Sequence, residues 1–206
     1  MRARTSATVS ALALSLSMAL SACSPDGGGS AAPEPGPAAA TAEDSAALLD
    51  RVGLAGRSGQ EIVDELERST EQRPLALSAS VREDHVLVGD GSQEVTVPLP
   101  KDLFYVSVAP FVDQTHECFY HSLATCRGEL AGEEVSVTIT DGEGEVLVEE
   151  TVTTQANGFT GFWLPRGIED GTIEVARNGA EGSVPLSTTP GSPTCVTTLQ
   201  LQPTEA

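Results

Sequence analysis

The chain has 206 residues and a formal net charge of −19, because 30 Asp and Glu residues outnumber 11 Lys and Arg residues. Such an acidic surface argues against nucleic-acid binding and disfavours docking on anionic lipid by charge. The length allows one hydrophobic core, or a small helical unit beside a β domain.

The N-terminus has the pattern of an export signal. Arg2 and Arg4 precede an apolar stretch over residues 9–20, which is too short to span a membrane. Leu20-Ser21-Ala22-Cys23 resembles the bacterial lipobox, a signal whose cysteine receives the lipid and starts the mature protein. We therefore predict that residues 1–22 are a lipoprotein signal peptide. Lipidated Cys23 would then anchor the protein to the outer face of the cell membrane, in the cell envelope.

Residues 23–42 consist almost entirely of Ser, Pro, Gly, Ala, Asp and Glu after the cysteine. This composition cannot form a core, and it predicts a disordered tether between the lipid and the folded part. Both methionines of the chain lie in the predicted signal peptide. A soft-metal site in the mature chain would therefore have to use cysteine and histidine.

Residues 43–74 are predicted to form a short helical hairpin. Leu48, Leu49 and Val52 lie on one face of a first helix, and two glycines then interrupt the pattern. The segment 58–61 fits a capping box that would start a second helix. The apolar face of this unit is expected to pack against the domain that follows.

From residue 75 to residue 202 the apolar period changes to two, which predicts strands. Asx-Gly turns separate many of them, and this pattern favours an antiparallel β-sandwich or open barrel. The predicted fold class is therefore α+β, with the helical hairpin followed by a mainly antiparallel, β-sandwich-like domain. The predicted strands are Leu75–Val81, His85–Val88, Glu94–Leu99, Leu103–Val108, Val135–Thr140, Glu145–Thr154, Phe159–Leu164, Thr172–Ala176, Gly182–Leu186 and Cys195–Leu201.

Several residues in this region are expected to have structural roles. The acidic turns near Asp90 and Asp141 lack the carboxylate spacing of an EF-hand and are expected to be hairpin turns. His85 is expected to be an exposed strand residue, and Trp163 is expected to be a core residue.

The long connection between the strands ending at Val108 and starting at Val135 carries the ligand types that bind soft metals. Its spacing is His116-x-Cys118-x2-His121-x4-Cys126. This is not a zinc-finger or zinc-ribbon pattern, and it lacks the C-x-x-C of thioredoxin-like proteins. Loops between rigid strands often carry function, so the spacing indicates a candidate metal site.

Cys195 begins the last predicted strand, and three thiols meet if that strand lies beside the loop. Thiolates select Cu(I) and also zinc, whereas imidazole suits Cu(II). The competing interpretation is a disulfide between Cys118 and Cys126 that staples the loop, because exported proteins form disulfides, and that leaves Cys195 buried and inert. Spacing alone leaves both interpretations open.

The amino-acid sequences of three segments resemble those of one known family. Residues 104–130 read FYVSVAPFVDQTHECFYHSLATCRGEL, residues 157–165 read NGFTGFWLP, and residues 193–201 read PTCVTTLQL. These blocks resemble the signature of the CueP family of periplasmic copper-binding proteins, and the similarity covers about residues 45–202.

The resemblance implies a copper-resistance protein of the envelope whose copper-carrying cysteines match Cys118, Cys126 and Cys195. It also implies reduction of Cu(II) to Cu(I), delivery of copper to exported superoxide dismutase, and a helical-then-β subunit that can form a homodimer. The lipobox is a departure from the family pattern. It favours sequestration at the membrane surface over free diffusion to a client.

The leading hypothesis is a tethered copper-binding protein with three cysteine thiolates and with His116 and His121 as auxiliary ligands. Glu117 is a weaker candidate, and zinc is the alternative metal. The competing hypothesis is a disulfide-stabilised scaffold or adhesion module without metal. No triad or paired carboxylates point to an enzyme, so the only chemistry expected is stoichiometric reduction of Cu(II) by thiols.

Overall fold

The computed structural model describes residues 41–204. The predicted signal peptide, the predicted lipidation site Cys23 and nearly all of the predicted tether lie outside the described residues. The tether was predicted to end at residue 42, but the first helix already begins there, with Thr41 as its N-cap. No described helix has the length and apolar character needed to cross a bilayer.

Both helices begin at a capping box, which satisfies backbone N–H groups that the first turn leaves free. Helix α1 spans Ala42–Arg51 and is capped by Thr41 and Asp44. Helix α2 spans Gly59–Glu67, and its predicted capping box between Ser58 and Glu61 is confirmed. Buried Leu48, Ile62, Val63 and Leu66 give each helix one apolar face.

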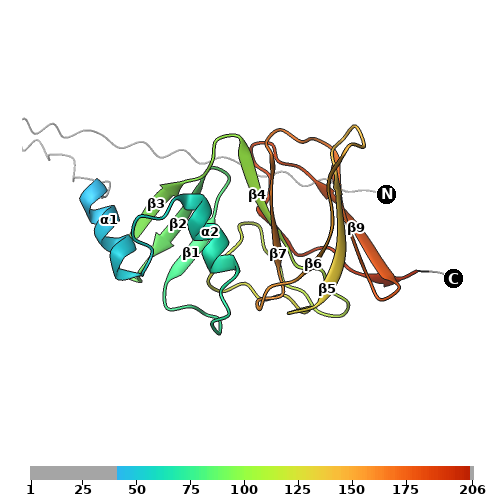
Figure 1. The fold of residues 1–206 in the computed structure, drawn as a ribbon, viewed down its shortest axis with the longest axis horizontal. Helices are drawn as coiled ribbons and strands as arrows, with labels where there is room; N and C mark the ends of the chain where they lie inside the picture. The colour runs from blue at the N-terminus through green and yellow to red at the C-terminus, as the bar shows by residue number, and fades with distance from the viewer. Residues whose placement is uncertain (1–40, 205–206) are drawn as a thin grey trace, which may run out of the picture. The chain divides into compact units, whose positions relative to one another are not determined.

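The strands form three sheets with the orders β1-β2-β3, β10-β4-β7 and β11-β9-β8-β5-β6 (Figure 1). All pairs of named strands are antiparallel except β10 with β4. The α+β class with a mainly antiparallel β domain is thereby confirmed. The strand bounds are β1 Ser78–Val81, β2 His85–Gly89, β3 Glu94–Pro98, β4 Leu103–Val108, β5 Glu134–Thr140, β6 Val146–Thr153, β7 Thr160–Pro165, β8 Gly171–Arg177, β9 Ala180–Leu186, β10 Cys195–Val196 and β11 Gln202–Pro203.

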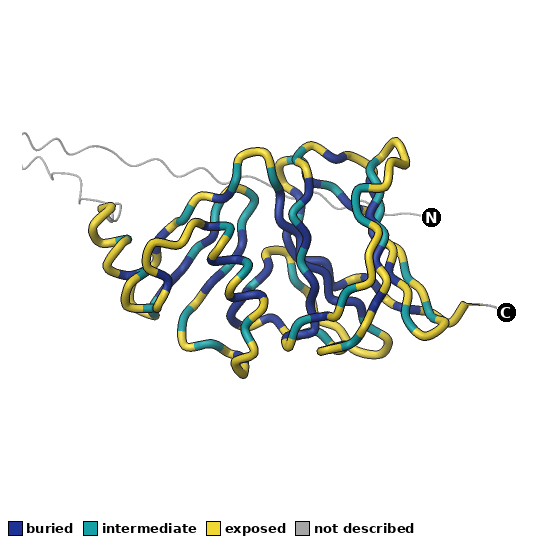
Figure 2. The backbone as a smooth tube through the Cα atoms, viewed as in Figure 1, coloured by how far each residue is buried: buried dark blue, intermediate teal, exposed yellow. Residues whose placement is uncertain are grey.

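The sheet of β4 and β7 is covered on both faces, so these strands run through the middle of the buried backbone (Figure 2). Phe104, Val106 and Phe162 point into a core shared with the five-stranded sheet. The alternate residues Tyr105 and Trp163 pack instead with the two helices and the sheet β1-β2-β3. This two-sided burial explains why β4 reads as a continuous apolar run rather than a strict alternation.

The last predicted strand is shorter than expected. Residues 195–201 were predicted as one strand, but β10 ends at Val196, and β11 starts only at Gln202 in a different sheet. The chain crosses from one sheet to the other in between, with a single bridge between Phe111 and Gln200. Because β10 pairs with β4 rather than with the outer sheet, Cys195 lies on the central sheet.

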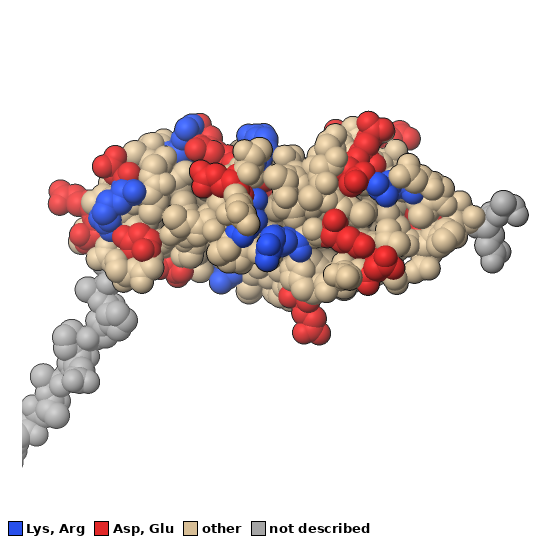
Figure 3. Space-filling view, turned by 90° about the horizontal axis from the view of Figure 1, so that it is seen from below, with Lys and Arg blue, Asp and Glu red and all other residues tan. Residues whose placement is uncertain are grey.

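On the face shown in Figure 3, the acidic side chains are spread out rather than gathered in one patch. In Figure 3, Asp and Glu groups occur along the whole face shown, with a few Lys and Arg groups among them. The two acidic turns act as predicted, since Asp90 accepts from the backbone of Ser92 and Gln93, and Asp141 accepts from Glu143 and Glu145. Their carboxylates stabilise turns instead of forming a calcium loop.

Candidate metal site

The loop between β4 and β5 is fixed on one side by the C-terminal segment. The backbone N–H groups of Thr194 and Cys195 both donate to the carbonyl of Phe119, at 3.0 and 3.1 Å. The Thr194 hydroxyl accepts from the backbone N–H of His121 at 3.0 Å and donates to the carbonyl of Val81 at 2.9 Å. Three segments distant in sequence are therefore tied together at the position of His121.

On its other side the same loop continues the edge of the sheet β1-β2-β3. Val81 donates to the carbonyl of His121 at 2.8 Å, and Leu123 donates to the carbonyl of Ala79 at 3.0 Å. The guanidinium of buried Arg73 donates to the carbonyl of Leu123 as well, at 3.2 Å. These bonds pair the backbone groups of a segment that has no regular secondary structure of its own.

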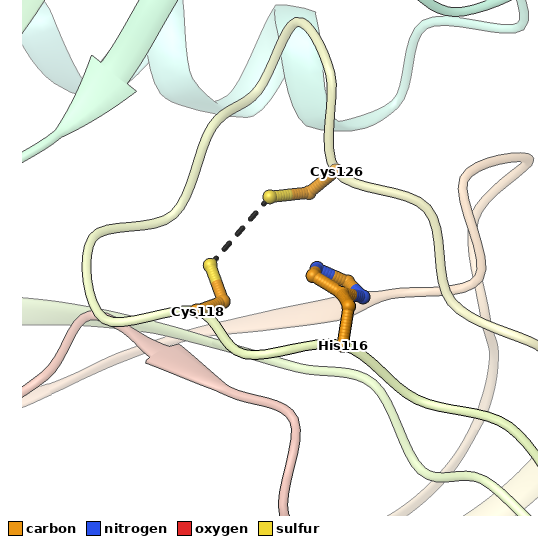
Figure 4. Close-up of side chains that lie close together, drawn as sticks. All are labelled: His116, Cys118 and Cys126. Atoms are coloured by element: carbon orange, nitrogen blue, oxygen red, sulfur yellow. Dashed lines mark hydrogen bonds between the residues drawn. The ribbon is translucent and has the colours of Figure 1, made fainter.

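The three cysteines meet in this loop, as expected if the last strand lay beside it. Cys118 and Cys195 form a disulfide with a Cα–Cα distance of 5.7 Å. The Cys126 sulfur is free and lies 3.6 Å from the Cys118 sulfur, towards which it points (Figure 4). The alternative pairing of Cys118 with Cys126 is therefore wrong in this structure. The parallel pairing of β10 with β4 is the reason, because it brings Cys195 into the loop.

The two candidate histidines occupy different environments around Cys126. His116 is exposed and can share an ion with Cys118 and Cys126, whereas buried His121 can share one with Cys126 and Cys195. Within each group the potential ligand atoms lie within 4.8 Å of one another. Cys126 belongs to both groups, so all five residues predicted from the sequence lie in one continuous site.

An open cleft gives access to the outer part of this site, and on the buried side of the site Phe159 packs in one apolar cluster with Cys126 and Cys195. The cleft is lined by residues that include His116, Glu117, Cys118 and Cys126. The Phe159 ring centroid lies 4.6 Å from that of His121 and 6.2 Å from that of His116. Glu117 lines the cleft but belongs to neither group of potential metal ligands among the described residues.

His121 is fully buried beside a buried carboxylate. Its Nε2 lies 2.8 Å from Oε2 of Glu67, although the ring N–H is not aligned for a regular hydrogen bond, and its Nδ1 lies 3.7 Å from the Cys195 sulfur. Burial by itself would lower the pKa of His121, but the charge and hydrogen bonding of Glu67 together with those of Cys126 outweigh burial and raise that pKa to about 9. The metal-free site therefore holds an imidazolium–carboxylate pair at neutral pH.

Glu67 accepts two further hydrogen bonds from the β domain. The Tyr105 hydroxyl donates to Oε2 and the Asn157 amide donates to Oε1, both at 2.9 Å. Burial would raise the pKa of Glu67, but His121 and these donors together lower it to about 2. Sequence reasoning missed all three residues. The available signal was the acidic pair Asp64 and Glu67 on one face of α2, where Asp64 in turn accepts from the Trp163 indole at 2.9 Å.

The donor set is that of a soft-metal site. Thiolate sulfur selects Cu(I) or zinc, and imidazole extends the choice to Cu(II). His85 takes no part, because it lies at the start of β2, where its Nδ1 contacts Asp84 at 2.6 Å. All cysteines and two of the three histidines in the described part of the chain thus lie together at one position of the fold.

Comparison with known proteins gives a consistent result. The family model described as "Periplasmic copper-binding protein CueP" matches residues 61–200. A solved structure, "Crystal Structure of S.CueP", is 42% identical, with a TM-score of 0.75 over 79% of this chain and 100% of that chain. The search of curated proteins gives no match. The matched region holds every candidate ligand, and the chain belongs to the CueP family of periplasmic copper-binding proteins.

Proposed function

We propose that this protein is exported and binds copper as Cu(I) through the site around Cys126. The observation that carries the proposal is that this free thiol lies 3.6 Å from a second cysteine and belongs to two groups of potential ligands. Membership of a family described as periplasmic and copper-binding supports copper as the metal. Zinc is the less favoured ion, because structural zinc sites usually use regularly spaced pairs of ligands.

The two thiolates of Cys118 and Cys195 would also reduce Cu(II). Each thiolate gives up one electron, so two Cu(II) ions become two Cu(I) ions while one S–S bond forms. The disulfide between these residues is the product expected of that step. Cys126, His121 and exposed His116 would then remain as ligands for Cu(I). When the disulfide is reduced again, all three thiolates are available for binding.

We also propose lipid anchoring through Cys23 and transfer of copper to exported cuproenzymes such as copper–zinc superoxide dismutase. An open cleft beside His116 and Cys126 supports transfer, because an acceptor protein could approach the ligands from solvent. Mixing copper-loaded protein with metal-free dismutase tests this step. Activation of the dismutase above a free-copper control is expected, and no activation would contradict transfer.

Copper binding is tested by titrating reduced protein with Cu(I) against a competing chelator. We expect the triple variant Cys118→Ser, Cys126→Ser and Cys195→Ser to lose at least about 100-fold in affinity, because serine offers no soft thiolate. The control is Ser122→Ala, a small substitution in the same loop that leaves every proposed ligand in place. Unchanged affinity in the triple variant would contradict the proposal.

The second candidate function is a scaffold that binds no metal, and the disulfide between Cys118 and Cys195 favours it. A disulfide closing so long a loop stabilises a fold even without a ligand. In that case reduction would lower stability, and Cu(I) added to the reduced protein would restore none of it. A copper-binding protein would instead regain stability with copper, because a ligand that binds only the folded state stabilises it.

A further inference from the structure

Glu67 lies at the end of α2 and has no place in the ligand set derived above, yet it is 4% exposed and surrounded by donors. An unpaired carboxylate so deeply buried would be costly, and here three donor groups from other elements face it. His121, Tyr105 and Asn157 come from the metal loop, from β4 and from the turn before β7. The position of the Glu67 carboxylate is thus determined by side chains from three separate parts of the fold.

The two ring nitrogens of His121 face different groups, and Glu67 lies on the side opposite the cysteine. Nε2 of the ring faces Glu67 at 2.8 Å, while Nδ1 faces the sulfur of Cys195 at 3.7 Å. A histidine that binds a metal generally gives its other ring N–H to a carboxylate or carbonyl, which fixes the tautomer and the ring orientation. Glu67 lies where such a partner is needed.

The surrounding packing keeps Glu67 in this place. Tyr105, whose hydroxyl donates to the carboxylate, packs against Trp163 with the rings tilted and their centroids 4.8 Å apart. Its hydroxyl lies against Gly161 on the neighbouring strand, where any Cβ would collide with it. Asn157 also accepts from the backbone N–H of Phe159, the residue whose ring packs on His121. Carboxylate, imidazole and aromatic ring are therefore positioned by one network.

We infer that Glu67 is a positioning residue for copper, which holds the Nε2 proton of His121 so that Nδ1 is presented to the ion beside Cys126 and Cys195. This inference rests on the proposed function. The helical unit of α1 and α2 would then have a role at the metal site through Glu67, although it contributes no ligand.

The test compares Glu67→Gln with the wild type in reduced protein. Glutamine has one acceptor oxygen, so it cannot accept from Asn157 on one side and from Tyr105 and His121 on the other. Cu(I) affinity, measured against a competing chelator, is expected to fall about 10–100-fold. Glu65→Gln is the matched control, because Glu65 lies on the same helix, is largely exposed and pairs only with Arg57, at 3.1 Å.

A second measurement separates positioning from general loss of structure. Cu(I) is diamagnetic, so the histidine ring nitrogens of the loaded protein can be observed by nitrogen-15 NMR. In the wild type, His121 should be protonated at Nε2 and metal-bound at Nδ1. Glu67→Gln should lose this single pattern, whereas His85, which takes no part in the site, should keep its own pattern and is the reference in the same spectrum. If Glu67→Gln does not fold, Tyr105→Phe is measured instead, since it removes one bond to Glu67 and keeps the packing ring.

The outcomes are distinct. A folded variant with affinity within about twofold of the wild type and an unchanged His121 pattern overturns the inference and leaves the proposed function standing. Wild-type protein that binds no Cu(I) overturns both. Weaker binding with a changed ring pattern in Glu67→Gln, and neither effect in Glu65→Gln, supports the positioning role.

Discussion

The Cys126 sulfur lies 3.6 Å from the sulfur of Cys118, and Cys118 is bonded to Cys195. A free thiol thus stands next to a disulfide, with one histidine on the solvent side and another on the buried side. The oxidation state of Cys118 and Cys195 therefore decides how many thiolates the site offers.

Protein prepared without reductant is expected to contain the disulfide between Cys118 and Cys195, with Cys126 as the free thiol of the described residues. The closed loop spans 77 residues, for which chain-entropy arguments give about 4.5 kcal/mol, and disulfides typically contribute about 2–4 kcal/mol of stability. Alkylation followed by peptide mapping identifies the pair, and urea unfolding of Cys195→Ser measures the loss. A mapped pair of Cys118 with Cys126 would contradict this prediction.

The stability of the copper-free protein should depend on pH through His121 and Glu67. The pKa of His121 is raised from 6.5 to about 9, so its contribution is complete below pH 6.5 and is lost as pH rises through 9. The pKa of Glu67 is lowered from 4.5 to about 2, so its contribution is complete above pH 4.5 and is lost as pH falls through 2. The pair therefore contributes most between these limits, at pH 4.5–6.5.

Urea unfolding measured from pH 6 to pH 9.5 checks the histidine half of this prediction. The free energy of unfolding should fall by at least about 1 kcal/mol across that range, since one pKa unit corresponds to about 1.4 kcal/mol. His121→Gln should remove most of this slope, because glutamine does not titrate. A variant that keeps the wild-type slope would show that another group is responsible.

Glu129 is expected to order the part of the loop that leads to His116. Its carboxylate accepts from three consecutive backbone N–H groups, those of Val112, Asp113 and Gln114, at 2.7, 3.0 and 3.2 Å. These donors lower the pKa of Glu129, which means that they favour its charged form. Glu129→Ala should speed hydrogen exchange of the three amides about tenfold or more, because hydrogen bonds to a charged group contribute roughly 1.5–3 kcal/mol.

Glu134→Ala is the control for this measurement, since Glu134 is an exposed acidic residue at the start of β5. Its exchange rates at residues 112–114 should equal those of the wild type. Equal rates in Glu129→Ala would mean that the loop is held by its other contacts, such as the Gln200 amide that donates to the carbonyl of Val112 at 2.9 Å.

The proposed lipid attachment at Cys23 predicts that the protein is found in the membrane fraction. Cys23→Ser should move it to the soluble envelope fraction or leave it unprocessed, and should abolish labelling by a radioactive fatty acid. The folded part should be unchanged in its unfolding temperature, because the substitution lies outside the described fold. Labelling that persists in Cys23→Ser would place the lipid elsewhere.

Much of the fold could be predicted because local patterns determine it. The bounds of β4 were predicted without error, and the capping box at Ser58 located the start of α2. The last strand was predicted too long, since residues 197–201 keep an apolar pattern while they cross between two sheets. The periodicity of apolar residues indicates which side chains are buried, but it does not indicate which sheet a segment joins or where it leaves that sheet.

The site was predictable only in part for a related reason. The thiols and imidazoles within the loop are close in sequence, whereas Cys195 reaches them only because β10 pairs in parallel with β4. The pairing partner of Cys118 therefore followed from topology and not from spacing. Glu67, Tyr105 and Asn157 converge from distant segments, and each reads in the sequence as an ordinary helix, strand or turn residue.

The most direct test of the central claim is X-ray absorption at the copper edge of reduced protein loaded with copper. We predict a Cu(I) edge and a first coordination shell with at least two sulfur atoms, and the sulfur signal should be lost in the triple cysteine-to-serine variant. A first shell of nitrogen and oxygen alone, or a spectrum that the triple variant reproduces, would contradict copper binding by Cys118, Cys126 and Cys195.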